Sequence, residues 1–364
     1  MISRLLQLFL AYEEDPSVKL VILKGQGRAF CAGGDVPPVV NNMVQGKWRL
    51  GADFFRDQYT LNYVMATYSK AQVSILNGIV MGAGAGASIH GRFRIATENT
   101  VFAMPETALG LFPDVGASYF LSRLPGFFGE YVGLTGARLD GAEMLACGLA
   151  THFVPSSRLT ALEADLCKVG TSDPSFVTTI LDAYTQHPHL KQKSVCHRQD
   201  PCLTRSLMGK KNSLCRLDVI DRCFSKRTME EIISALERDA TQELDDWILT
   251  TIRALKKSSP SSLKISLRSI REGRLQGVGQ CLVREYRMVC HVMKGDISKD
   301  FVEGCRAILI DKDTNPKWKP KRLEDMKDNM VDQYFERVEE EERWEDLKLS
   351  PRNNLRASKI AAKL

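Results

Sequence analysis

Long apolar runs are missing from this chain of 364 residues. A membrane-spanning helix needs roughly 20 consecutive apolar residues, and no stretch approaches that length, so we expect no membrane association. A strong charge of either sign is also missing, because 50 basic and 44 acidic residues leave a net charge of +6. A nucleic-acid-binding protein concentrates basic residues on one face, and this excess is too small to predict nucleic acid as a partner.

Paired cysteine motifs are missing as well, although the sequence contains ten cysteines. No two of them are separated by two residues, which excludes the spacing of zinc ribbons and of dithiol redox motifs. Several stand beside apolar residues, as Cys147 and Cys290 do, and we expect reduced, buried thiols typical of an intracellular protein. Three histidines lie near Cys196, but their irregular spacing fits no metal-ligand pattern, so no metal site is expected.

The composition that is present, 44% hydrophobic and 26% charged residues, is ordinary for a folded protein and excludes disorder over most of the chain. The length allows two domains, or one large domain with an appendage. Apolar, β-branched runs at 18–25 and 72–80 and two shorter ones after them predict buried strands, and helical stretches such as 53–69 lie between them. This alternation predicts an α/β fold with mostly parallel strands.

The pattern changes after about residue 155. A capping box at Thr228–Glu231 opens a predicted helix over 229–257, and a charged helix with a solvated face is predicted over 323–346. Residues 199–215 show no period and are interpreted as a surface loop. The second half is therefore expected to be largely helical.

The two ends of the chain carry different signals. Ile2, Leu5 and Phe9 fall on one helical face, and the lack of a small-residue cleavage site favours an amphipathic core helix over a secretory signal. The last three residues, Ala362-Lys363-Leu364, match the Ser-Lys-Leu class of peroxisomal address, which an import receptor reads. We expect that receptor as a partner and the peroxisome as the location, with a frayed tail as the alternative.

Two glycine-bearing turns, at 31–35 and 82–86, follow the predicted strands 18–25 and 72–80. Small residues let a ligand approach backbone N–H groups closely, and the helix start predicted after the second turn adds partial positive charge. Two such turns at neighbouring strand ends can direct two N–H donors at one oxygen, as in an oxyanion hole. A dinucleotide-binding loop is the rival, but the glycine spacing is wrong and no acidic residue stands at the ribose position.

Two carboxylates stand in an apolar segment. Glu106 and Asp114 are the only acids among residues 102–116. A carboxylate that loses hydration among apolar side chains has a raised pKa, which suits acid or base work. A capping pair in a tight loop is the structural alternative.

These residues together resemble the crotonase superfamily, through CAGGD at 31–35, GIVMGAGAG at 78–86 and MPETALGLFPDVG at 104–116. Within it, the segments 134–154 and 300–320 are similar to those of 3-hydroxyisobutyryl-CoA hydrolases, and the AKL ending to the plant peroxisomal ones. The resemblance implies a spiral of ββα units, with an acyl-CoA-binding core over 1–155 and a helical region over 156–364 that completes the same fold. It also implies a homo-oligomer.

The resemblance implies specific roles in hydrolysis of 3-hydroxyisobutyryl-CoA, a step of valine breakdown. The backbone N–H groups of Gly34 and Ala83 would hold the thioester oxygen. Glu106 would attack the thioester or activate water, and Asp114 would position the 3-hydroxyl or assist proton transfer. No cofactor is implied, because coenzyme A is part of the substrate.

The sequence departs from the family pattern at several places. Gln58 stands in the substrate pocket where the family commonly has a glutamate, and Ala83 stands at the oxyanion glycine. Gly86 takes the place of the second glutamate that a hydratase needs, which disfavours hydration of an enoyl-CoA. The family's first strands should precede residue 1, and 199–215 resembles an insertion. A catalytically impaired acyl-CoA-binding paralogue and an enoyl-CoA hydratase/isomerase stay as alternatives.

Overall fold

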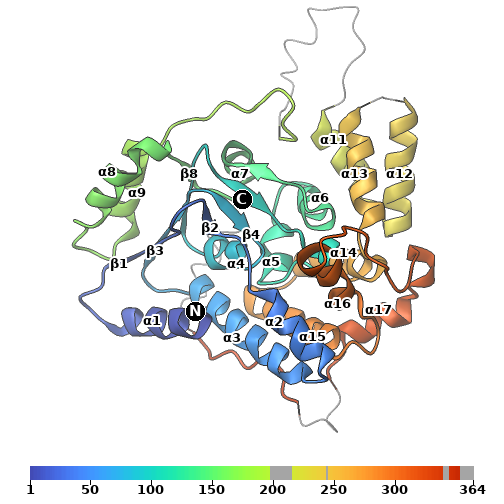
Figure 1. Ribbon diagram of the computed structural model, residues 1–364. Coiled ribbons are helices and arrows are strands. Elements are labelled where there is room, and N and C mark those ends of the chain that lie inside the picture. The colour runs from blue at the N-terminus through green and yellow to red at the C-terminus, as the bar shows by residue number, and fades with distance from the viewer. Residues whose placement is uncertain (197–214, 243–244, 339–343, 353–364) are drawn as a thin grey trace, which may run out of the picture.

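Two four-stranded sheets form the centre of the molecule (Figure 1). The computed structural model describes residues 1–196, 215–242, 245–338 and 344–352. The strands are β1 (Leu20–Lys24), β2 (Ala29–Cys31), β3 (Ala71–Leu76), β4 (Ile79–Met81), β5 (Phe93–Ala96), β6 (Val101–Ala103), β7 (Leu139–Asp140) and β8 (His152–Phe153). Their order is β1-β3-β5-β8 in one sheet and β2-β4-β6-β7 in the other. Each successive strand pair therefore gives one strand to each sheet, which is the ββα spiral that the resemblance implies.

The predicted single strand over 72–80 is wrong. It is divided into β3 and β4, which belong to different sheets. The break lies at Gly78, whose φ of +104° is a conformation that side chains rarely adopt. A Cβ on Gly78 would also lie 2.4 Å from the carbonyl oxygen of Arg28, so only glycine allows this crossing.

The sequence analysis did not predict strand β2, and it therefore assigned the first glycine turn to the wrong preceding strand. The turn at 31–35 follows β2, whereas the predicted strand 18–25 is β1 in the other sheet. The pairings β2–β4 and β4–β6 are parallel, with Ala29 opposite Ile79 and Val80 opposite Phe102. Because these strands run in the same direction, their carboxyl ends meet at one edge of the sheet.

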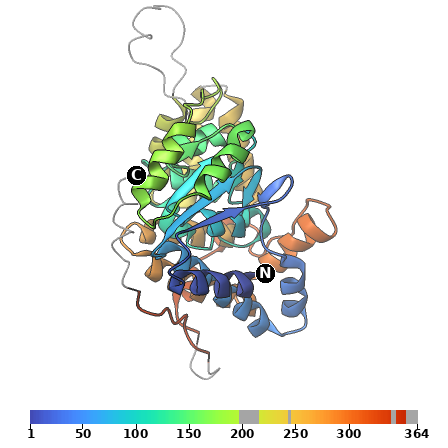
Figure 2. The same cartoon turned by 90° about the vertical axis from the view of Figure 1, so that its left-hand side faces the viewer.

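The helices of the first half surround the sheets. Helices α8 and α9 cover the β1-β3-β5-β8 sheet, as Figure 2 shows, through a cluster that includes Val73, Ile95, Leu162 and Leu181. The predicted amphipathic helix at the N-terminus is confirmed as α1, because Phe9 is buried and its ring lies 5.0 Å from that of Tyr68. The bounds are α1 (Ile2–Glu14), α2 (Val36–Val44), α3 (Trp48–Ala66), α4 (Ala83–Ile89), η1 (Glu106–Leu109), α5 (Ala117–Leu121), α6 (Phe128–Thr135), α7 (Gly141–Cys147), η2 (Ser156–Arg158), α8 (Leu159–Leu166) and α9 (Pro174–Tyr184).

The second half is largely helical, as predicted, with different boundaries. The predicted helix 229–257 consists of two helices, and the Asp245 side chain caps the second by accepting from the N–H of Trp247. The predicted helix 323–346 is interrupted: η4 ends at Asp325, α17 covers Asp328–Phe335, and the described residues 336–338 and 344–352 are not helical. The bounds are α11 (Arg216–Phe224), α12 (Met229–Gln242), α13 (Asp246–Lys257), α14 (Pro260–Gly273), α15 (Val278–Lys294), α16 (Asp300–Cys305), η3 (Arg306–Ile310), η4 (Leu323–Asp325) and α17 (Asp328–Phe335).

One large cluster of buried side chains draws on both halves of the chain. It joins Phe112 and Phe120 of the first half to Leu263 and Leu282 of the second. Burial of such side chains contributes about 1.5–3 kcal/mol each, so the two halves stabilise each other. Within the described residues, no helix has both the length and the apolar character needed to cross a membrane.

Two predicted segments lie outside the described residues. They are the loop at 199–215, of which only Cys215 is described as the residue before α11, and the C-terminal Ala362-Lys363-Leu364.

Candidate active site

The candidate residues gather where β2, β4 and β6 end. Gly33 and Gly34 follow β2, Gly82 and Ala83 follow β4, and Glu106 comes shortly after β6. A Cβ on Gly82 would lie 4.0 Å from the Cα of Gly33 and 2.9 Å from Oε1 of Glu106. Gly82 therefore lies between the first glycine turn and the carboxylate, and the structure brings all three together.

Glycine at two positions allows the turns to approach each other this closely. A Cβ on Gly84 would lie 2.2 Å from the carbonyl oxygen of Cys31, so any side chain there would push the turns apart. Gly82 has a φ of +51° and precedes α4. Ala83 is thus the first residue of α4, where backbone N–H groups have no partner within the helix. Its methyl group leaves that N–H group in place.

Glu106 is a buried acid at the start of η1, with 5% of its surface exposed. Its Oε2 has no hydrogen-bond partner among the described residues. Burial, together with the charge of nearby Asp114, raises the pKa of Glu106 well above its usual range. A buried carboxylate with an unpaired oxygen and a raised pKa is suited to take a proton or to attack an electrophile.

Asp114 is equally buried, and its Oδ2 accepts a hydrogen bond of 2.9 Å from the hydroxyl of Tyr59 on α3. Burial raises the pKa of Asp114 to about 7, with a further contribution from the charge of Glu285, while the bond from Tyr59 opposes the rise. Glu106 and Asp114 influence each other, so their protons come off as those of a pair. The structure therefore supplies two acids that titrate far above ordinary carboxylic acids.

A strained turn follows Asp114. Val115 has a φ of +57° and Gly116 a φ of +83°; the left-handed conformation is an outlier for a β-branched residue and typically costs about 1–3 kcal/mol. Nε2 of His90 lies 2.7 Å from the carbonyl oxygen of Val115. Burial lowers the pKa of His90 to about 4, so the imidazole is neutral and its Nε2–H donates to that oxygen.

The sequence analysis missed Glu285, a fully buried acid on α15 that bonds to the same turn. Its carboxylate accepts from the N–H of Gly116 at 2.6 Å, and from the N–H and Oγ of Ser118 at 3.0 and 2.6 Å. No local motif marks it, because its partners lie more than 160 residues earlier in the chain. Tyr59 was missed for the same reason, although it directly follows Gln58.

Gln58 lies on the face of α3 that is directed towards the site. Phe54, one turn earlier, would contact a Cβ on Gly34 at 3.5 Å, and Asn62, one turn later, lies against Gly86. Residues four apart share one face of a helix, so buried Gln58 lies between these two contacts.

Gly86 has no space for a side chain. A Cβ there would lie 2.5 Å from the Cβ of Val115 and 2.9 Å from Nδ2 of Asn62. The position is closed by the turn after Asp114, so a glutamate could not be accommodated without moving that turn. Packing of the turn after Asp114 therefore excludes a carboxylate side chain from this position.

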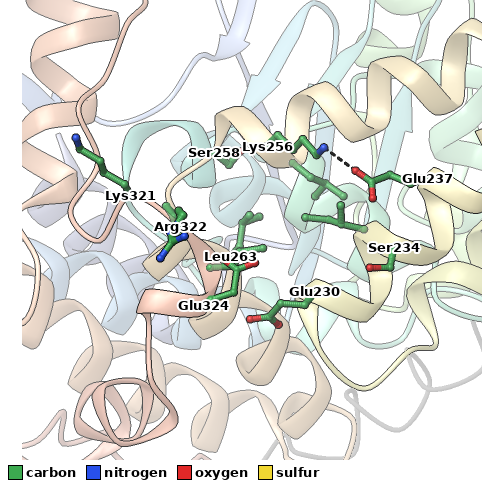
Figure 3. A pocket seen from close by; sticks show the side chains of 13 residues that line it. Glu230, Ser234, Glu237, Lys256, Ser258, Leu263, Lys321, Arg322 and Glu324 are labelled. Atoms are coloured by element: carbon green, nitrogen blue, oxygen red, sulfur yellow. Dashed lines mark ion pairs between the residues drawn. The ribbon is translucent and has the colours of Figure 1, made fainter.

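A separate hollow of about 440 Å³ lies between α12, α13, α14 and η4 (Figure 3). Its charges balance, as shown by Lys256, Lys321 and Arg322 beside Glu230, Glu237 and Glu324. Lys256 and Glu237 form an ion pair of 2.6 Å. The hollow is connected to the candidate site only through neighbouring backbone. Ser259 lies between the lining residues Ser258 and Pro260, and its N–H donates to the carbonyl oxygen of Thr107, next to Glu106, at 3.2 Å. We assign it no catalytic part.

Within the part of the chain that the structure describes, no three His, Cys, Asp or Glu side chains form a metal-binding cluster. Cys147 and Cys290 are buried and form no disulfide, as the sequence analysis predicts.

The chain is similar to known proteins over nearly its whole length. A family model for enoyl-CoA hydratase/isomerase matches residues 1–335. An Arabidopsis thaliana protein named probable 3-hydroxyisobutyryl-CoA hydrolase 3 is 88% identical over 100% of this chain and 92% of its own length. A second, 3-hydroxyisobutyryl-CoA hydrolase 1 of the same species, is 79% identical over 99% of this chain and 90% of its own.

A solved structure shows the same fold. The carnitinyl-CoA dehydratase from Mycobacterium thermoresistibile is 32% identical, with a TM-score of 0.79, and the match covers 95% of this chain and 90% of that one. The expected arrangement of sheets and C-terminal helices is thereby confirmed.

Proposed function

This chain belongs to the enoyl-CoA hydratase/isomerase family, among its 3-hydroxyisobutyryl-CoA hydrolases, and we propose that it hydrolyses 3-hydroxyisobutyryl-CoA to 3-hydroxyisobutyrate and free coenzyme A. The observation that carries the mechanism is the position of Glu106, whose carboxylate lies against Gly82 in the second glycine turn. The reaction fits a step in valine catabolism. Beyond the substrate it needs water and the residues of the chain.

The two glycine turns would stabilise the developing oxyanion. In thioester hydrolysis the carbonyl oxygen gains negative charge as the tetrahedral intermediate forms. The N–H groups of Gly34 and Ala83 are the proposed donors to this oxygen. Loss of one such donor typically costs about 2.7–4 kcal/mol of transition-state stabilisation, so the placement of these turns accounts for a large share of the rate.

Glu106 would act on the thioester carbon by one of two routes. As a nucleophile, its carboxylate forms an anhydride with the acyl group, the C–S bond breaks, coenzyme A leaves as the thiolate, and water then cleaves the anhydride. As a base, it takes a proton from water while the hydroxide adds to the carbonyl carbon; the tetrahedral intermediate then collapses, the C–S bond breaks and coenzyme A leaves as the thiolate, which takes up a proton. In a single turnover in H₂¹⁸O, an unlabelled product together with ¹⁸O in the Glu106 side chain identifies the first route with water attacking the Glu106 carbonyl carbon of the anhydride. The second route puts one ¹⁸O in the product and none in Glu106.

Asp114 would serve as the partner acid. With a pKa of about 7 it is partly protonated near neutrality, so it can donate a hydrogen bond to the substrate's 3-hydroxyl or a proton to the leaving thiolate. The bond from Tyr59 fixes its Oδ2. Gln58, one residue away on α3, would contact the acyl group without adding a third charge.

A thiol-release assay tests the proposal. With 3-hydroxyisobutyryl-CoA we expect stoichiometric free thiol, and with crotonyl-CoA no hydration, because Gly86 leaves no room for the second carboxylate. Glu106→Gln should reduce turnover by about 10²–10⁴-fold, the usual contribution of a positioned base. If the wild-type protein binds the thioester without turnover, it is the acyl-CoA-binding paralogue instead.

We also propose that the protein acts in the peroxisome. The support is the C-terminal Ala362-Lys363-Leu364, which matches the receptor-read address. A fluorescent protein fused to the N-terminus should give punctate signal coinciding with a peroxisomal marker, and deletion of Leu364 should make it diffuse. Unchanged puncta after the deletion would contradict this address.

We also propose that the protein forms a homo-oligomer, as the family resemblance implies. Light scattering of the purified protein tests this, and a monomeric mass would contradict it.

A further inference from the structure

The carboxylate of Glu285 forms its hydrogen bonds with a single turn of the chain, at residues 116–118. Its side chain is fully buried on α15, and its hydrogen bonds go to Gly116 and Ser118. A buried carboxylate is costly unless hydrogen bonds satisfy it. Here two backbone N–H groups and one hydroxyl do so, and the desolvation of Glu285 is offset by bonds that define the position of this turn.

The turn needs such anchoring because it is strained. Val115 and Gly116 both adopt the left-handed conformation, and only glycine does so readily. His90, the residue after α4, holds the carbonyl of Val115, and Glu285 of α15 holds the N–H of Gly116. The side chains of His90 and Glu285 therefore hold the carbonyl group and the N–H group of the peptide bond between Val115 and Gly116.

We propose that Glu285 is a positioning residue for hydrolysis: by anchoring the strained turn at 115–118 it fixes the carboxylate of Asp114, which immediately precedes the turn, against Tyr59 and beside Glu106. The proposal rests on the proposed function. In this role Glu285 does not contact the substrate and acts through the backbone of the turn.

The charge of Glu285 gives this role a second consequence. Burial is the largest cause of the raised pKa of Asp114, and the charge of Glu285 is the next. For Glu106, burial and the charge of Asp114 raise the pKa most, and the charge of Glu285 adds a smaller rise. The ionisable groups that face this cluster from the packed elements are Tyr59 of α3, neutral His90 after α4, Glu106 of η1, and Cys281, Arg284 and Glu285 of α15. Among the acids in this set, only Glu285 forms hydrogen bonds to the turn. It therefore fixes the position of the turn and, through its charge, also raises the pKa of the two acids beside it.

Glu285→Gln separates position and charge when compared with a matched variant. The glutamine removes the negative charge and turns a donor towards the N–H of Gly116. Ser118→Ala removes one hydrogen bond and leaves the charge and both backbone donors in place. Steady-state rates with 3-hydroxyisobutyryl-CoA from pH 5 to 9 would be measured for both variants and for wild type, with circular dichroism to establish folding.

For Glu285→Gln we expect kcat to fall by about tenfold or more with KM changed by less than about threefold, and the acid limb of kcat/KM to move down by roughly one pH unit. For Ser118→Ala we expect a smaller fall in kcat and an unmoved limb. Glu285→Asp, which keeps the charge on a shorter side chain, should keep the limb while kcat stays low. A folded Glu285→Gln protein with wild-type kcat and an unmoved limb overturns the proposal.

Two further outcomes are decisive. The first is that Glu285→Gln does not fold. The proposal then stands only if Ser118→Ala lowers kcat without moving the acid limb of kcat/KM, and if Glu285→Asp folds and has a low kcat. Wild-type rates in both Ser118→Ala and Glu285→Asp overturn it. If the wild-type protein releases no thiol, the proposed function fails, and ¹³C-carboxyl NMR titration tests the positioning role without turnover. The Asp114 resonance should then titrate at lower pH in Glu285→Gln than in wild type, and an unchanged titration contradicts the role.

Discussion

Glu106 and Asp114 place two acids where water is excluded, and this makes the site a source of instability. A carboxyl group with a raised pKa in the folded protein holds its proton at pH values where the unfolded chain has already lost it. Between about pH 4 and pH 7, the folded state therefore binds more protons than the unfolded state at Asp114. Stability consequently falls as the pH rises through this window.

Asp114→Asn should reverse this penalty. The asparagine keeps an oxygen that can accept from Tyr59 and removes the buried charge. We expect a higher Tm than wild type at pH 8, where the gain has an upper bound of about 4 kcal/mol at ~1.36 kcal/mol per pKa unit, and equal Tm values near pH 4. Differential scanning calorimetry across this range measures it. Equal Tm values at pH 8 would show that Asp114 is not destabilising when charged, and turnover should be lost in either case.

At this scale the sequence identified acids but not their partners. Glu106 and Asp114 stand out because the residues around them are apolar, a signal contained in fifteen consecutive positions. Tyr59 and Glu285 lie 55 residues before Asp114 and 169 residues after Gly116, respectively. Nothing in their own neighbourhoods distinguishes them, because their function arises from packing of distant helices.

Helix α4 contributes to the candidate site at two positions. Its start supplies the Ala83 N–H, and one turn later it packs against Val115 and Asn62 through Gly86. The first position faces the proposed oxyanion and the second is closed by the turn after Asp114. The helix therefore provides donors and excludes a second carboxylate by the same close packing.

Gly86→Ala tests this packing. The added methyl group would lie 2.5 Å from the Cβ of Val115, so we expect a loss of about 1–3 kcal/mol, typical of overpacking, and slower hydrolysis as the turn moves. Gly170→Ala is the matched control, because a Cβ there has nothing within 4 Å. Thermal unfolding of both variants gives the comparison. If Gly86→Ala is as stable as Gly170→Ala, the position has space and the exclusion of a glutamate is wrong.

The element boundaries show where sequence patterns lose information. The apolar run 72–80 predicts a strand, and the run is extended, but the positive φ of Gly78 sends its second part into the other sheet. Strand β2 is only three residues long, too short for a periodic signal. The predicted helix over 323–346 follows a charge pattern, yet the chain leaves α17 at Phe335.

At the scale of the whole molecule, segment 344–352 holds the helical half against the N-terminal half. The ring of Trp344 stacks on Tyr286 of α15 at 6.3 Å and lies 5.0 Å from that of Trp48. Asp346 accepts two-pronged hydrogen bonds from Arg287, with distances of 2.6–3.0 Å. Arg352 forms an ion pair with Glu13 of α1. The segment therefore connects α15, α3 and α1.

Trp344→Ala should loosen this connection. We expect a loss of about 1–3 kcal/mol, below the ~3–5 kcal/mol of a fully buried tryptophan, because Trp344 is only half-buried. Lys348→Ala, on an exposed side chain of the same segment, serves as the control and should change stability little. Urea unfolding of both variants measures the difference, and equal midpoints would mean that the segment contributes no stability through its aromatic contacts.

The bonds from Gly116 and Ser118 to Glu285 also have a consequence for how the protein is made. They close loops of 169 and 167 residues, so the strained turn cannot be anchored until α15 has left the ribosome and packed. The parallel strands can pair long before that, since their partners are nearer in sequence. Competence for chemistry should therefore be acquired late in synthesis, and a prematurely terminated chain that ends before α15 can form strands without ever forming the working geometry of Asp114.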